Sequence, residues 1–226
     1  MRELEPALRS GLADLALVLD DGQIALLLDY LALIQKWTQV YNLTAVRDPA
    51  EMLTHHLLDS LAVINPLRRQ LAGLRDQAAA AAVNVAKLRL LDVGSGGGLP
   101  GVVIAICCPE IAVDCVDTVA KKVAFIRQVA ATLKLANLRG LHARVENLTD
   151  PYRVICSRAF ASLADFTRLS SAALAPQGLW LAMKAKDTAD EVAALPTTVN
   201  VFHVEQLVVP GVDADRCIVW MRQSAQ

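Results

Sequence analysis

The sequence predicts an α/β protein: a helical amino-terminal segment followed by a mostly parallel sheet with helices on both faces. Three observations predict this fold class. Apolar residues recur at helical spacing early in the chain, short strands and helices then alternate, and a glycine cluster follows the first strand. The alternation brings the carboxyl ends of the strands to one edge of the sheet, where a ligand crevice is expected.

The amino-terminal extension, residues 1–75, is expected to be helical. Its apolar residues have the i, i+3, i+4, i+7 spacing of one helix face, at Ile24, Leu27, Leu28, Leu31 and Ile34. A second helical segment is expected to start at Pro49 and to end at Pro66, because proline disrupts a helix interior. The alanine-rich residues 76–86 are interpreted as a connector.

The remaining residues, 87–226, are predicted to form the α/β domain. Strands are expected at 87–93, 112–116, 138–143, 153–157, 179–183, 199–208 and 217–221. Helices are expected at 100–107, at 120–135 and near 163–175. The last two strands suit an antiparallel hairpin, so the sheet should be seven-stranded and mostly parallel, with an antiparallel strand near its carboxyl end.

Composition excludes several classes of protein. No apolar run reaches the roughly 18 residues that span a bilayer, and the first residues lack the order of a signal peptide, so a soluble cytoplasmic protein is expected. The five cysteines are an odd number without a C-x-x-C pair. We therefore expect buried thiols and neither a disulfide framework nor a metal site.

The glycine cluster is the most informative motif. Asp92 ends the first strand, and D-x-G-x-G-x-G follows with Gly94, Gly96 and Gly98. Glycines permit positive φ and close approach of a ligand, and the next helix offers free N–H groups to an anion. The motif fits S-adenosylmethionine, whose carboxylate would meet N–H donors and whose ammonium would meet Asp92. Because G-x-G-x-x-G is also satisfied, a nicotinamide dinucleotide stays an alternative.

Two acids follow the next strands. Asp117 closes the second strand, where a carboxylate can accept hydrogen bonds from ribose hydroxyls. Its alternative role is the N-cap of the helix near Ala120. Glu146 follows the third strand, where an adenine edge would arrive, and otherwise it is a surface acid.

The charge distribution is uneven. Six cations and no acid lie between Thr118 and Val145, although the net charge of the chain is −1. We expect this field to stay uncancelled and to face nucleic acid, the alternative being a solvated basic helix.

These motifs, in this order, resemble those of the bacterial 16S ribosomal RNA guanine-N7 methyltransferases, also called the glucose-inhibited division protein B family. The resemblance starts near Leu31 and includes two later groups of residues, Arg144-Val145-Glu146 and Ser157-Arg158-Ala159-Phe160-Ala161. It also includes Tyr41-Asn42-Leu43-Thr44 and His56-Leu57-Leu58-Asp59-Ser60 in the helical part.

The resemblance implies a class I S-adenosylmethionine-dependent methyltransferase with a Rossmann-like sheet. Its substrate would be N7 of one guanosine, guanosine 527, of 16S ribosomal RNA or of a small-subunit assembly intermediate. The implied cofactor contacts, joined with those from the glycine motif, are Asp92, Gly94, Gly96, Gly98, Leu99, Asp117, Val145, Glu146 and Arg158. Arg158 and Lys184 would position substrate and cofactor. The expected RNA contacts are Lys121, Lys122, Arg127, Lys184 and Lys186. No metal is implied, and a monomer is expected.

Methylation of N7 requires no proton removal, since N7 carries an available lone pair. We therefore expect no general base, and catalysis that depends on orientation. Arg158 could instead form a structural salt bridge. Three other functions stay open: a pyrimidine methyltransferase with Cys156 as nucleophile, a nicotinamide-linked oxidoreductase, and an RNA-binding scaffold without catalysis.

Overall fold

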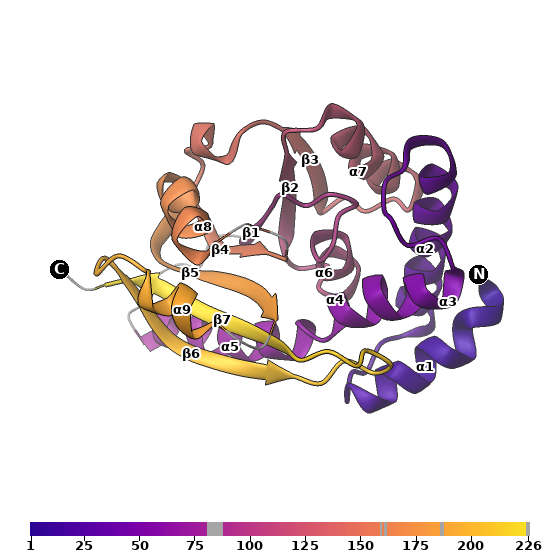
Figure 1. Cartoon of the computed structure of the whole chain (residues 1–226), viewed down its shortest axis with the longest axis horizontal. Coiled ribbons are helices and arrows are strands. Elements are labelled where there is room, and N and C mark those ends of the chain that lie inside the picture. Colours follow the sequence, from indigo (N-terminus) through magenta and orange to yellow (C-terminus); the bar gives the residue numbers. More distant parts are fainter. Residues whose placement is uncertain (81–87, 159, 161, 186–187, 225–226) are drawn as a thin grey trace.

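The computed structural model describes residues 1–80, 88–158, 160, 162–185 and 188–224. The amino-terminal helices are α1 (Glu5–Asp14), α2 (Asp21–Tyr41), α3 (Pro49–Met52), a π-helical turn (Leu53–Leu58), α4 (Asp59–Leu61) and α5 (Ile64–Ala80). They lie along the right and lower parts of Figure 1, beside the sheet. The expected helix around Ile24–Ile34 is confirmed as α2.

Helix α2 begins where the sequence provides a capping box. The carboxylate of Asp20 accepts a hydrogen bond from the backbone N–H of Gln23, and the side chain of Gln23 accepts one from the N–H of Asp20. The same Gln23 side chain donates to the carbonyl of Ile106 in the α/β part, at 3.0 Å. The cap therefore fixes both the start of α2 and its position against the sheet layer.

The prediction that Pro66 ends the second helical segment is wrong. Pro66 is the third residue of α5, which continues to Ala80. Proline is tolerated there because the first N–H groups of a helix have no helical partner. Residues 81–87, the rest of the expected connector, lie outside the described residues.

In the part of the chain that the structure describes, the sheet has seven strands in the order β3-β2-β1-β4-β5-β7-β6. Their bounds are β1 (Arg89–Val93), β2 (Ala112–Asp117), β3 (Leu138–His142), β4 (Tyr152–Ser157), β5 (Leu174–Ala185), β6 (Val199–Leu207) and β7 (Arg216–Gln223). All neighbouring pairs are parallel except those made by β7, which is antiparallel to both β5 and β6. The predicted mostly parallel sheet with an antiparallel carboxyl-terminal strand is confirmed.

Strand β5 starts five residues earlier than expected. It begins at Leu174, and its pairing with β4 shifts register between Tyr152 and Val154. The sequence Pro176-Gln177-Gly178 favours a turn, and Gln177 has the positive φ of 56° that such an irregularity requires. The helix expected to reach Ala175 consequently ends earlier, as α8 (Leu163–Ser170) followed by a 3₁₀ turn at Ser171–Ala173.

The sheet has a hydrophobic core on each face. Alternate residues face opposite sides, so Leu90 packs in one core and Leu91 in the other. The first core joins the sheet to α6 (Gly101–Cys107), to α7 (Ala120–Thr132) and to the amino-terminal helices. The second core lies beneath α8, and α9 (Ala189–Ala193) packs against α8. The amino-terminal helices therefore share a core with the α/β layer.

The buried residues include all five cysteines, each of which is a free thiol, as expected. Among the described residues, no helix combines the length and apolar character that a bilayer crossing requires. The described residues also contain no cluster of histidine, cysteine or carboxylate side chains that could bind a metal ion.

Candidate active site

The glycine loop follows β1 at the carboxyl edge of the sheet. Gly94, Gly96 and Gly98 have φ values of 65°, 58° and 89°, which confirms the expected left-handed backbone. A Cβ added at Gly94 would meet no atom within 4 Å, so this residue faces open space. A Cβ at Gly98 would lie 2.4 Å from Val102 and 2.6 Å from Ile126. Gly94 thus leaves space open on the outer side of the loop. Gly98 lets the loop pack closely on the helices behind it.

The N–H groups of this region are mostly used within the protein. Those of Gly94 and Ser95 donate to the carbonyl of Val116, and that of Gly96 donates to Asp117. At the start of α6, the N–H of Gly101 donates to the Asp92 carboxylate at 2.9 Å. The expectation that this helix offers free N–H groups to an anion is therefore wrong for Gly101, because a buried carboxylate already occupies that position.

Asp92 lies beneath the loop. Its side chain is fully buried, and its Oδ2 accepts the Gly101 hydrogen bond. Burial raises the pKa of Asp92 to about 7, against hydrogen bonding from Gly101 and the charge of Arg158, which lower it. Asp92 therefore fixes the loop from the protein interior.

Asp117 connects β2 to the same loop. Its Oδ2 accepts the Gly96 N–H at 3.0 Å, and its Oδ1 accepts the N–H of Val119 at 2.8 Å. The ammonium of Lys122 lies 3.8 Å from Oδ2. The N-cap residue of α7 is Val119, without a side-chain cap hydrogen bond, so the alternative role of Asp117 as N-cap is wrong.

A cavity of about 190 Å³ opens beside the loop. The glycine loop forms one wall, helix α2 and the segment after it form another, and the π-helical turn completes it. The lining residues are Ile34, Leu43, Thr44, His56, Gly94, Ser95, Gly96, Gly97, Leu99, Lys122 and Arg158. The structure thus brings together Gly94, Gly96, Leu99 and Arg158, four of the expected cofactor contacts, and it adds Lys122, which was expected to contact RNA. We call this the loop cavity.

Helix α2 supports the loop cavity from behind. The hydroxyl of Tyr30 donates a 2.6 Å hydrogen bond to the carbonyl of Gly97. His56 is buried, and its Nε2 is 2.9 Å from the hydroxyl of Thr44. Burial, and then the charge of Arg158, lower the pKa of His56, so the imidazole is neutral near pH 7. Sequence reasoning noted His56 only as part of a family signature.

Val145 and Glu146 lie on a 3₁₀ turn (Val145–Asn147) after β3. Val145 is buried in the second core with Val93 and Val116, at the ends of the neighbouring strands. Glu146 is exposed, 3.5 Å from Arg144. Neither residue lines the loop cavity, so their contact with a cofactor stays a prediction.

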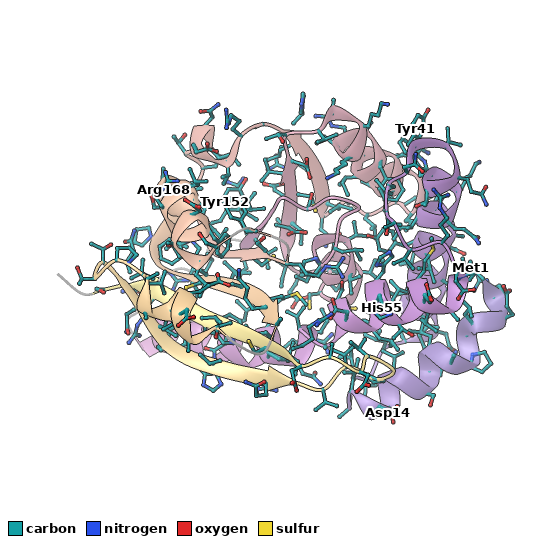
Figure 2. All side chains as sticks on the ribbon, viewed as in Figure 1. Met1, Asp14, Tyr41, His55, Tyr152 and Arg168 are labelled. Carbon is teal, nitrogen blue, oxygen red and sulfur yellow. The ribbon has the colours of Figure 1, made fainter. Side chains whose placement is uncertain are left out.

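A second cavity, of about 300 Å³, shares Arg158 with the loop cavity. We call it the arginine cavity, and it is lined by His55, Asp59, Arg158, Met183, Lys184, Ala185 and Arg216. Figure 2 labels His55 on the π-helical turn of the amino-terminal helices. Arg158 belongs to both cavities and is thus the residue at which they meet.

Arg158 is held by residues to which sequence reasoning assigned no role, although Asp59 is part of the family signature. Its Nη1 donates to the Asp59 carboxylate and to the carbonyl of His55, each at 2.9 Å. The salt bridge considered as its alternative is therefore present, but inside the site. Arg216 pairs with the same carboxylate at 3.1 Å. Knowledge that β7 is antiparallel to β5, with Arg216 opposite Ala185, would have placed Arg216 near Lys184.

Lys184 is near the end of β5, as predicted. Its ammonium forms a 2.8 Å ion pair with Glu191 of α9 and lies 3.3 Å from the carbonyl of Phe160. Lys186 lies outside the described residues.

The expectation that the positive charge between Thr118 and Val145 stays uncancelled is wrong. Arg139 makes two 2.7 Å hydrogen bonds to Asp114, an acid from the adjacent strand β2. Arg127 donates to the carbonyl of Gly140. Lys121 lies 5.7 Å from the centre of the half-exposed Tyr41 ring, which Figure 2 shows at the upper end of α2.

The structure gives Cys156 no features of a nucleophile. Its thiol is fully buried, and burial raises its pKa well above the ordinary value. A thiolate is the reactive species, so this environment disfavours the reaction.

Comparisons with known proteins agree on one family. A family model described as rRNA small subunit methyltransferase G matches residues 23–219. A protein of that name from Albidiferax ferrireducens is 88% identical, over all of both chains. One from Paracidovorax citrulli is 64% identical, covering 97% of this chain and 90% of that protein.

Solved structures share the fold at low sequence identity. TrmN from Thermus thermophilus aligns with a TM-score of 0.51 and 21% identity over 61% of this chain, which spans only 44% of TrmN. A mutant of MtNAS aligns with a TM-score of 0.50 and 14% identity over 99% of this chain and 78% of that one.

Proposed function

Since the chain belongs to the family of rRNA small subunit methyltransferase G, we propose that it methylates N7 of a single guanosine of 16S ribosomal RNA, guanosine 527, with S-adenosylmethionine as methyl donor. The observation that supports this proposal best is the pair of cavities meeting at Arg158. One is walled by bare glycine backbone, and the other is lined by cations. A cofactor and an RNA strand need these two environments.

The residues of the loop cavity fit S-adenosylmethionine. The open space beside Gly94 lets a ligand approach the backbone, and Ser95 lines the same wall of the cavity. We assign Gly94, Gly96 and Leu99, which line the cavity, to the adenosine part, and we place Asp117, Val145 and Glu146, which do not line it, beyond them. Arg158 suits the carboxylate. Asp92, which the sequence suggested for the ammonium, is proposed to support the loop instead.

The cofactor supplies an electrophilic methyl group on a positively charged sulfur. The task of the protein is then to hold N7 in line with that methyl group in a dry site, and good orientation contributes roughly 7–11 kcal/mol. The neutral His56 helps, because it adds no positive charge beside the sulfonium. Arg158 and Lys184 are proposed to hold phosphate, guanine O6 or the cofactor carboxylate. A cation at N7 would oppose the charge that develops on the ring.

The remaining RNA contacts are proposed on α7 and near the end of β5. Lys121, Lys122 and Arg127 would contact phosphates beside the loop cavity, and Lys184 and Lys186 would do so beside the arginine cavity. The protein is proposed to act in the cytoplasm.

The experiment is methylation of 16S ribosomal RNA and of small subunits with labelled S-adenosylmethionine, followed by mass mapping of the product. We expect one 7-methylguanosine, at guanosine 527. Incorporation at another atom or nucleotide would overturn the assignment of the target. No incorporation, despite cofactor binding by calorimetry, would favour the scaffold alternative. Binding of NAD in place of S-adenosylmethionine would favour the oxidoreductase.

A further inference from the structure

One buried carboxylate holds both arginines of the arginine cavity. Asp59 is only 5% exposed, its Oδ2 accepts from Nη1 of Arg158 at 2.9 Å, and its Oδ1 accepts from Nε of Arg216 at 3.1 Å. In the sequence, Arg158 is 99 positions and Arg216 is 157 positions from Asp59. They join the helical extension, the end of β4 and the start of β7 at one point.

The π-helical turn makes this arrangement possible. The N–H of Asp59 is shared between the carbonyls of His56 and Thr54, three and five residues earlier, and the bond to Thr54 is the π-helical one. In an α-helix its partner four residues earlier would be the carbonyl of His55. That carbonyl instead accepts the second hydrogen bond from Nη1 of Arg158, at 2.9 Å. The irregular turn thus provides both acceptors that fix Arg158.

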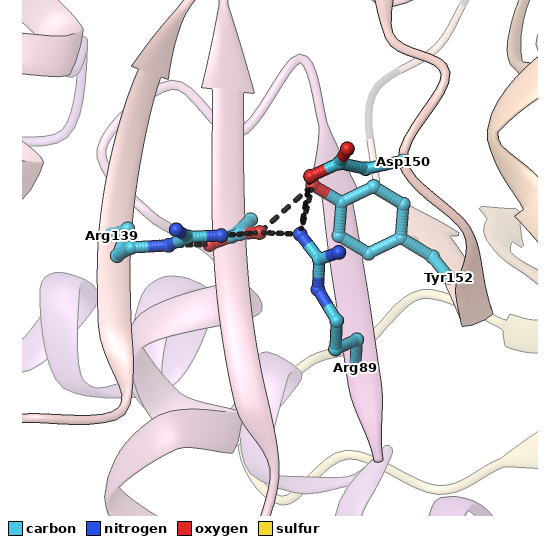
Figure 3. A network of polar contacts seen from close by, with 5 residues as sticks. Arg89, Arg139, Asp150 and Tyr152 are labelled. Carbon is cyan, nitrogen blue, oxygen red and sulfur yellow. Dashed lines mark hydrogen bonds and ion pairs between the residues drawn. The ribbon is translucent and has the colours of Figure 1, made fainter. Parts of the chain in front are cut away.

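A second buried carboxylate, Asp114, also accepts hydrogen bonds from two arginines, but it does not line either cavity. Asp114 accepts hydrogen bonds from Arg89 at 3.0 Å, from Arg139 at 2.7 Å and from the hydroxyl of Tyr152 at 2.8 Å (Figure 3). Burial would raise the pKa of Asp114, but these hydrogen bonds lower it below its usual value. Neither cavity is lined by any of these residues, so this network links strands β1 to β4 and serves as a structural reference.

Charge indicates which ligand the arginine cavity suits. Its described lining contains the cations Arg158, Lys184 and Arg216 and the carboxylate Asp59, and Lys184 pairs with Glu191 just outside the lining, which leaves one positive charge in excess among these groups. Each arginine uses only part of its set of N–H donors on Asp59, and the guanidinium geometry matches a phosphate group. An excess of cations in a partly buried cavity favours an anionic group.

We propose that Asp59 is a positioning residue for the reaction proposed above, on which this inference rests. Asp59 holds Arg216 with its remaining donors toward the arginine cavity, where they bind a phosphate of the ribosomal RNA strand, and it fixes Arg158 between the two cavities. It does not contact the reacting atoms itself.

The first test compares Asp59→Asn with Asp114→Asn, each measured per mole of folded enzyme. We expect Asp59→Asn to lower kcat/KM for ribosomal RNA by roughly tenfold to a hundredfold, chiefly through KM, as a misplaced positioning group does. Asp114→Asn should lose thermal stability but keep the wild-type KM. Equal KM values for Asp59→Asn and wild type would overturn the proposal, since a merely structural carboxylate affects only the amount of folded enzyme.

The second test needs no catalysis, and it remains valid if Asp59→Asn fails to fold. Equilibrium binding of a 16S RNA fragment is measured against salt for wild type and Arg216→Gln. We expect the variant to bind more weakly and its log affinity to depend less on log salt, by about 0.7 for one lost single-strand phosphate contact. An unchanged slope would overturn the phosphate assignment. A changed slope without 7-methylguanosine formation by wild type would refute the proposed function alone.

Discussion

Asp92 is a carboxyl group in a place that disfavours its charge. In the unfolded chain its pKa is near 3.8, and burial raises it to about 7 in the folded protein. Between these values the folded state binds more protons than the unfolded state, so this residue makes the free energy of unfolding decrease as pH rises. Above about pH 7 the carboxylate is ionised in both the folded and the unfolded state, so the stability that protonated Asp92 gives the folded protein at lower pH is fully lost.

Asp92→Asn should therefore gain stability relative to wild type as pH rises from about 4 to 7. The difference between 3.8 and about 7, at about 1.4 kcal/mol per pH unit, gives an upper limit of about 4 kcal/mol. Urea unfolding of both proteins at several pH values measures it. A stability difference that is independent of pH would contradict the shifted pKa.

Gly94 and Gly98 have different reasons to be glycine, and substitutions should separate them. Gly94→Val places its side chain in open space at a φ of 65°, so we expect cofactor binding to be lost while the protein still folds. Gly98→Ala would press on Val102 and Ile126, so we expect mainly a lower melting temperature. Calorimetry with S-adenosylmethionine and thermal denaturation measure the two effects. Retained binding by Gly94→Val would refute the position of the cofactor.

At the scale of elements, helix α7 begins beside the loop cavity with two lysines in its first turn. The helix dipole disfavours cations there by a few tenths of a kcal/mol or more. Lys122 is compensated by Asp117, at 3.8 Å, while Lys121 lies over the ring of Tyr41. The two lysines are therefore expected to act differently.

We expect Lys121→Ala to weaken RNA binding and to flatten its salt dependence by about 0.7, with S-adenosylmethionine affinity unchanged. Lys122→Ala should weaken both, because Lys122 also lines the loop cavity. Lys134→Gln removes the same charge just after the end of α7 and serves as the control. Filter binding across a salt series, together with calorimetry, measures these effects. The same salt slope for Lys121→Ala and wild type would show that this face is only solvated.

The sequence predicted elements whose signal is local. The apolar spacing of α2, the β-branched runs of the strands and the glycine loop each depend on neighbouring residues. The prediction failed for contacts that depend on a partner distant in the sequence. The pairing of Arg139 with Asp114 depends on the register between β3 and β2, and the contacts of Asp59 depend on the π-helical turn and on residues about 100 positions away or more. No local pattern encodes those distances.

At the scale of the whole molecule, the amino-terminal helices complete the core on one face of the sheet. Leu27, Leu28 and Leu31 of α2 are fully buried there. Burial of each such side chain contributes about 1.5–3 kcal/mol, and a whole domain is stable by only about 5–15 kcal/mol.

We therefore expect residues 88–226 alone not to fold. The shortened chain should lack a cooperative thermal transition by circular dichroism, whereas the full chain should show one. A cooperative transition in the shortened chain would mean that the helical extension is a separate domain.

The position of Arg158 between the two cavities has a thermodynamic consequence. A ligand that moves this side chain, or neutralises it, changes the environment that the other ligand meets. By linkage, the factor by which ribosomal RNA alters the affinity for S-adenosylmethionine must equal the factor by which the cofactor alters the affinity for RNA. A methylated product and a spent cofactor would obey the same reciprocity, so a change at Arg158 that loosens one in the presence of the other would loosen the other by the same factor.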